Sequence, residues 1–118
     1  MQLRCVRIIS SYGEELEHHP AVSVGAVYDV VSIECVPGDD PSVLICTEED
    51  GPSWWNIRMF TCVSPDIFAN WQISIRDDGT LDIGPAQLNA PGFLEDLYEG
   101  DAESRRIFED EFLRYRIT

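Results

Sequence analysis

The side chains able to do chemistry are few in this chain, and their spacing matches no known catalytic pattern. The only imidazoles, His18 and His19, are adjacent. Neighbouring side chains on an extended chain point in opposite directions, so such a pair rarely binds one metal ion. Both histidines lie among glutamates, in a segment whose composition indicates a solvated loop. A hydrolase that uses His18 or His19 is one alternative interpretation of the sequence.

The spacing and neighbours of the cysteines predict that they have a structural role and form neither a metal site nor a nucleophile. Their spacings of 30, 11 and 16 residues form no paired C-x-x-C, so we expect no structural zinc. Each has strand-like neighbours and the N-terminus carries no export signal, so we expect reduced, buried thiols that act as small core residues. The four are Cys5, Cys35, Cys46 and Cys62.

Carboxylates are so abundant that adjacent pairs carry little information. Glycosidase chemistry needs two of them across a cleft, which a sequence cannot show, and a D-x-D-x-D-G calcium loop is absent. The phosphate-binding and nucleophile motifs G-x-x-x-x-G-K, G-x-G-x-x-G and G-x-S-x-G are absent as well. We therefore expect a protein that is not an enzyme and needs no cofactor or metal.

The charge of the chain predicts its class of partner. Twenty-two acidic residues and eight basic ones, all arginine, give a formal net charge of −14. Such a surface repels nucleic acids and anionic membranes, whereas it attracts basic proteins and speeds encounter with them. No apolar run is long enough to span a membrane, and we expect a cytoplasmic protein. Solubility alone, salt adaptation and arginine-rich codon usage remain open explanations of the charge.

Two adjacent tryptophans, Trp54 and Trp55, are the aromatic residues best suited to binding. On a strand, one of them should face inward and the other outward. An outward tryptophan beside Glu48, Glu49 and Asp50 would suit an interface hot spot surrounded by charge. Burial of both tryptophans is the alternative.

The elements that must position these residues are mainly strands, followed by helices. β-Branched residues in 25–36 and 42–47 around the turn at 37–41 predict a hairpin, and 71–83 predicts another with one apolar face. Further strands are expected over 3–9 and 53–62, a loop over 10–22, and a helical turn from Ser64 and Pro65.

Helical spacing appears only near the C-terminus. Phe93, Leu94, Leu97 and Tyr98 predict a short helix, which Gly100 would end. Asp101 would cap a second helix from Ala102 to about Tyr115. Its apolar stripe would hold Ile107, Phe108, Phe112 and Tyr115, and its other face Glu103, Glu109 and Asp110.

The run from Val24 to Val30, a hairpin, an acidic turn and Trp54-Trp55 through Phe60 to Val63 resembles a bacterial or phage SH3-like small barrel. In such domains a glycine opens the strand after a long first loop, and an aromatic strand ends in a short helical turn. The resemblance covers about residues 3–64. In size, charge and compartment the chain is also similar to immunity proteins that neutralise polymorphic bacterial toxins.

The sequence therefore predicts one α+β domain over residues 1–118. It would hold a bent antiparallel SH3-like sheet or partial barrel at 3–64, a β-hairpin at 71–84 and C-terminal helices within 93–116. The predicted function is stoichiometric binding of a basic protein, as an immunity protein that inhibits a toxin such as a nuclease. An SH3-like adaptor with no inhibitory role is the alternative.

The predicted contact residues are Glu48, Glu49 and Asp50 with Trp54 and Trp55. The turn at 39–40 is set aside, because consecutive hairpin turns fall at opposite ends of a sheet and 48–50 is nearer the tryptophans. The second choice of contact surface is the acidic face of the last helix, with Glu103, Glu109 and Asp110.

Overall fold

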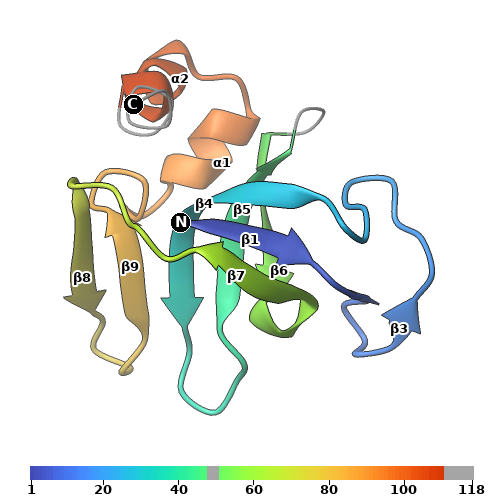
Figure 1. Cartoon of the computed structure of the whole chain (residues 1–118). Helices are drawn as coiled ribbons and strands as arrows, with labels where there is room; N and C mark the ends of the chain where they lie inside the picture. Colours follow the sequence, from blue (N-terminus) through green and yellow to red (C-terminus); the bar gives the residue numbers. More distant parts are fainter. Residues whose placement is uncertain (48–50, 111–118) are drawn as a thin grey trace.

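Antiparallel strands form most of the regular secondary structure in the described chain and two short helices follow them, which is an α+β arrangement (Figure 1). The structure, a computed structural model, describes residues 1–47 and 51–110. The strands are β1 (Gln2–Cys5), β2 (Ile8–Ile9), β3 (Glu15–Leu16), β4 (Val27–Cys35), β5 (Ser42–Thr47), β6 (Gly51–Asn56), β7 (Phe60–Ser64), β8 (Trp71–Ile75) and β9 (Leu81–Pro85). The 3-10 turn η1 (Ile57–Met59) joins β6 to β7, and the helices are α1 (Phe93–Tyr98) and α2 (Ala102–Phe108).

The strand β4 organises the sheet because it pairs along its length with three others. Its first half bonds to β1 and its last residues bond to β9, while β5 runs along its other edge. The strand order is β6–β5–β4–β1–β7, with the β8–β9 hairpin added through β9. Within the described residues no pairing joins β6 to β7, so the sheet is not closed.

Both predicted hairpins are confirmed, as β4–β5 and β8–β9. The first predicted strand, 3–9, is instead split into β1 and β2. The break has a physical cause, since the backbone N–H groups of Val6 and Arg7 both donate to the carbonyl of Met59, at 2.8 and 3.3 Å. β2 then pairs with β3, so the expected loop 10–22 contains a short second sheet.

The helical turn predicted from Ser64 and Pro65 is wrong. Ser64 is the last residue of β7, and residues 65–70 form a connection without regular structure that ends in a turn. The short helical turn lies earlier, at η1, inside the strand predicted over 53–62. Asn56 begins it, because its side chain accepts a hydrogen bond from the backbone N–H of Arg58 at 2.8 Å.

Two apolar cores lie on opposite faces of the sheet. Val30, Val43 and Ile45 belong to the first, which fills the bend of the sheet and includes Trp71. The second holds Val31 and Leu44 beneath the helices, together with Leu88, Phe93 and Phe108. Alternating side chains of β4 and β5 therefore supply both cores.

Helix α1 and the start of α2 lie where the sequence predicts them. α2 extends to Phe108, and the end predicted near Tyr115 falls on residues that the structure does not describe. Gly100 follows α1 with φ +85°, a conformation that glycine adopts without strain. Asp101 caps α2 by accepting from the backbone N–H of Ser104 at 2.9 Å, and this bond lowers the pKa of the Asp101 carboxyl. Phe112 and Tyr115 lie outside the described residues. No helix in the described ranges is long and apolar enough to cross a membrane.

The expectation of buried cysteines holds only in part. Cys5 is buried and burial raises the pKa of its thiol, whereas Cys62 is exposed. Cys62 lies on β7, which pairs with β1 alone among the described strands and so forms an edge of the sheet. Cys35 and Cys46 are partly buried, and none of the four cysteines forms a disulfide.

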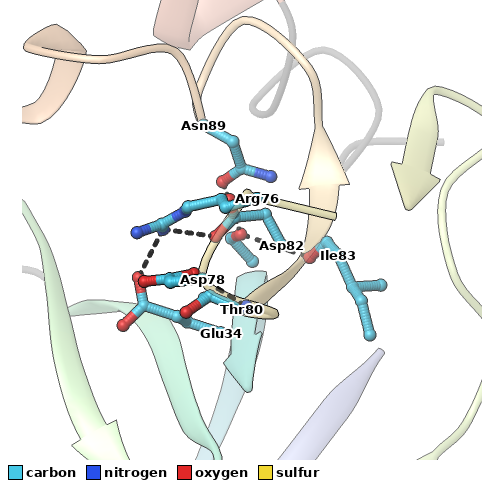
Figure 2. A network of polar contacts seen from close by, with 8 residues as sticks. Glu34, Arg76, Asp78, Thr80, Asp82, Ile83 and Asn89 are labelled. Atoms are coloured by element: carbon cyan, nitrogen blue, oxygen red, sulfur yellow. Dashed lines mark hydrogen bonds and ion pairs between the residues drawn. The ribbon is translucent and has the colours of Figure 1, made fainter. Parts of the chain in front are cut away.

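An arginine-centred network ties the β8–β9 hairpin to β4 (Figure 2). Arg76, which follows β8, donates from Nε and Nη2 to the two carboxylate oxygens of Asp82 at 2.7 and 2.6 Å. Its Nη2 also donates to Glu34 of β4 at 2.7 Å. The Asp82 side chain is 9% exposed, so its charge depends on this partner. The two carboxylates raise the pKa of Arg76.

Close to this network, Ser32 of β4 donates to the carbonyl of Ile83 at 3.2 Å and contacts the Asn89 side chain at 2.8 Å (Figure 2). Gly84 passes so near that a Cβ there would lie 2.8 Å from the Ser32 hydroxyl. A side chain at position 84 would therefore push β9 away from β4.

We predict that Arg76→Met lowers the free energy of unfolding by about 2 kcal/mol, because it leaves the nearly buried Asp82 carboxylate without its partner. Arg106→Met is the matched control, since Arg106 pairs with Glu103 and Asp110 on the exposed surface of the α2 region. Exposed pairs contribute little, so this variant should unfold like the parent protein. Urea titration measures both, and equal effects of the two substitutions would contradict the structural role given to Arg76.

Candidate functional site

A groove of about 520 Å³ lies between the long first loop and β6. We call it the tryptophan groove. The loop contributes Ile9, Ser10, Ser11, Gly13, Leu16 and His19, and the opposite side holds Asp40, Trp54, Trp55, Asn56 and Arg58. A groove of this size, with aromatic walls and a few polar groups, has the properties of a binding site.

Trp54 and Trp55 face opposite sides of β6, which confirms that one lies inward and the other outward. Trp55 pairs across the strands with Val43 and packs against the first core. Its indole N–H donates to the Ser53 hydroxyl at 2.8 Å. Trp54 pairs with Leu44 on the other face and is 36% exposed. The outward tryptophan is therefore Trp54.

His19 forms part of the groove wall, and the expectation that both histidines are merely solvated is wrong for it. Its ring meets the Trp55 ring edge-on, with 4.8 Å between centroids and 88° between planes. Its Nδ1 accepts from the backbone N–H of Ala21 at 3.0 Å, which fixes the ring orientation. His18 is exposed, so the adjacent rings do lie in different environments.

The opposite rim of the groove is held by a small polar cluster around Asp40. The Asp40 carboxylate lies 3.3 Å from Nε of Arg58 and accepts from the Asn56 amide at 3.2 Å. Arg58 is placed in turn by η1, and Arg7 donates to its carbonyl from the β1–β2 junction. Asp40 belongs to the turn that sequence reasoning set aside, and the structure brings it to the groove beside the tryptophans.

The acidic turn that the sequence favoured, Glu48, Glu49 and Asp50, lies outside the described residues, so its predicted contact role stays a prediction. The first loop carries three exposed acidic residues, Glu14, Glu15 and Glu17, beside the groove-lining residues Gly13 and Leu16. The loop tip is ordered by Ser10, whose hydroxyl accepts from the backbone N–H groups of Tyr12 and Glu14 at 3.2 Å each. The groove is thus bordered by an ordered acidic loop.

A second hollow, of about 350 Å³, lies on the other side of Trp54. Its walls are the Arg76 network, the connection before α1 with Asn89, and Leu94 of α1. Trp54 lines both hollows and separates them. An aromatic residue in that position can be covered from two sides by one partner, which is the geometry of a hot spot.

The other candidates from the sequence are less suited to binding. Glu103 and Asp110 both form ion pairs with Arg106, and the hydrogen bond from Arg106 lowers the pKa of Glu103. Glu109 is exposed beside them. Within residues 1–47 and 51–110 no three His, Cys, Asp or Glu side chains are grouped so that they could hold a metal ion.

Sequence reasoning set Asp40 aside, and it missed Arg58 and the contact between His19 and Trp55. Only the loop length signalled that residues 10–22 had a role. Comparison with protein-family models, curated proteins and solved structures gave no match. The geometry of the groove is therefore the basis for inferring function.

We predict that His19→Ala lowers the free energy of unfolding by about 1 kcal/mol, because it removes an edge-to-face aromatic contact from the groove wall. The indole N–H resonance of Trp55 should shift in the same variant. His18→Ala is the matched control and should change neither the stability nor the resonance. If His18→Ala had the same effect as His19→Ala, the wall role of His19 would be refuted.

Proposed function

We propose that this protein is a non-catalytic binding protein for a basic partner protein, and that the tryptophan groove receives a segment of that partner. The observation that carries the proposal is the position of Trp54, exposed between two hollows and next to the acidic first loop. Aromatic side chains in such positions supply most of the binding energy at interfaces, while the surrounding charge steers the approach.

We infer further that residues 3–64 form a bent SH3-like sheet, a partial barrel. Three features support this: the strand order β7–β1–β4–β5–β6, the glycine Gly25 ahead of β4 after a long first loop, and the short helical turn η1 after the aromatic strand β6. The β8–β9 hairpin and the helices are additions to such a barrel. They widen the binding surface, since the second hollow beside Trp54 is built from them.

The net charge of −14 supports a more specific role, inhibition of a basic toxin such as a nuclease. A protein that binds phosphate presents a basic surface, and an acidic inhibitor can occupy it in place of the phosphates. Binding without inhibition would instead define an adaptor. Adding the protein to its purified partner at equal concentration, and measuring the partner's own activity, separates the two roles.

We predict that ten-residue peptides in which arginine alternates with apolar residues bind the groove. Titrated into the ¹⁵N-labelled protein, they should shift the indole N–H resonances of Trp54 and Trp55. The resonance of Trp71, which is buried in the first core, is the internal control and should not move. Peptides with glutamate in place of arginine should not bind.

Substitutions separate the two contributions to this binding. Trp54→Ala should weaken it by about 2 kcal/mol, mainly through faster dissociation. Arginine at positions 14, 15 and 17 should slow association and reduce its salt dependence. Arginine at positions 96, 99 and 109 changes the net charge by the same amount, and none of these positions lines the groove, so this triple variant is the control. Equal loss of association rate in both triple variants would assign the effect to net charge alone, against the proposed groove.

A further inference from the structure

One segment of the chain departs from its acidic character. From Met59 to Ile75 there is a single charged residue, Asp66, in a protein with 22 acidic and 8 basic residues. The same segment holds exposed apolar side chains, above all Ile73 and Ile75 of β8, which are 70% and 73% exposed. Val63 and Ile67 are exposed as well. The apolar face predicted for the second hairpin therefore exists, but beyond Trp71 no part of the chain that the structure describes covers it.

The strand β8 also offers an open edge of the sheet. Among the described residues only β9 pairs with it, and Figure 1 shows it at the left margin of the sheet. Arg76 N–H donates to the Thr80 carbonyl at 2.9 Å, which makes 76 and 80 a hydrogen-bonded pair of the hairpin. Because such pairs alternate with non-bonded pairs, the N–H and C=O groups of Ile73 and Ile75 point to the open edge.

Natural edge strands usually carry a charge, a proline or a bulge that prevents pairing with another chain. Residues 71–75, Trp-Gln-Ile-Ser-Ile, contain none of these protections. We propose that β8 is the contact through which two copies of this chain form a dimer. The two β8 strands would run antiparallel about a two-fold axis, with Ile73 opposite Ile73 of the second copy and the sheet continuing from one copy to the other.

Charge favours a second copy as the occupant of this edge. Two molecules with a net charge of −14 repel each other over most of their surfaces, and β8 is an uncharged place at which they can approach. In the two-fold register the nearest charged residue, Arg76, comes opposite Asn70 of the second copy, so no acidic residues oppose each other. A basic partner would gain nothing from this uncharged strand, whereas the acidic loop at the groove attracts it.

The dimer leaves the tryptophan groove open. β8 contributes no residue to that groove, and Figure 1 places β8 and β3 at opposite sides of the molecule. A dimer joined at β8 would therefore carry two grooves far apart, and it could hold two partner molecules. The inference does not rest on the proposed function, because the two surfaces are separate.

Sedimentation velocity over a range of protein concentration tests the dimer. One strand pair buries less than the roughly 1,200 Å² of a standard interface, so we expect a Kd of about 1 μM or weaker. Raising the salt concentration from about 0.05 M to about 0.5 M should lower the Kd of the dimer, because salt screens the repulsion between the acidic copies. Salt weakens binding of a basic partner, so the opposite dependence distinguishes the two associations.

Two further measurements locate the contact. Ile73→Lys should raise the Kd at least about tenfold, whereas Val24→Lys, the same change at another exposed apolar residue, should not. The amide protons of Ile73 and Ile75 should exchange more slowly with solvent as the dimer forms, while those of Gln72 and Ser74, which bond to β9, should not change. A protein that stays monomeric at the highest concentration and salt would overturn the proposal. A dimer unaffected by Ile73→Lys would overturn it as well.

Discussion

The pairing of β4 with three other strands is the constraint on which the rest of the structure depends. Along one edge, β4 pairs with β1 at its beginning and with β9 at its end. Along the other edge it pairs with β5. The register shifts between Val30 and Ser32, which bends the strand where its partners change. Since every larger part of the fold is attached through β4, a change in its register would displace the β6–β5–β4–β1–β7 sheet, the second hairpin and the helices together.

The candidate site follows from this arrangement. β5 and β6 continue the sheet from β4 and present Trp54 and Trp55 on opposite faces, because side chains alternate along a strand. The pairing with β1 places the first loop next to β6, so that His19 reaches Trp55. The pairing with β9 places the Arg76 network on the other side of Trp54. Trp54 is exposed between two hollows because β4 holds two different strands along one edge.

Local patterns predicted the elements better than their partners. The β-branched residues of 25–36 and the caps at Gly100 and Asp101 act through near neighbours, so the hairpins and short helices could be predicted. The Ser64-Pro65 signal failed because no amphipathic turn follows it, and η1 is too short to leave a periodic pattern. The contact of His19 with Trp55 and the position of Asp40 depend on long-range pairing, which no local pattern encodes. Alternation predicted an apolar face at Ile73 and Ile75, but it could not show that nothing in the described chain covers this face.

The most direct test of the central claim is a crystal structure of the protein with an arginine-containing peptide bound. The account predicts that the peptide lies across Trp54 in the tryptophan groove, with a guanidinium group within hydrogen-bond distance of Glu14, Glu15 or Glu17. Such a geometry would join the aromatic contact and the acidic loop in one interface. A peptide bound instead along the acidic face of the α2 region, at Glu103 and Glu109, would contradict the account.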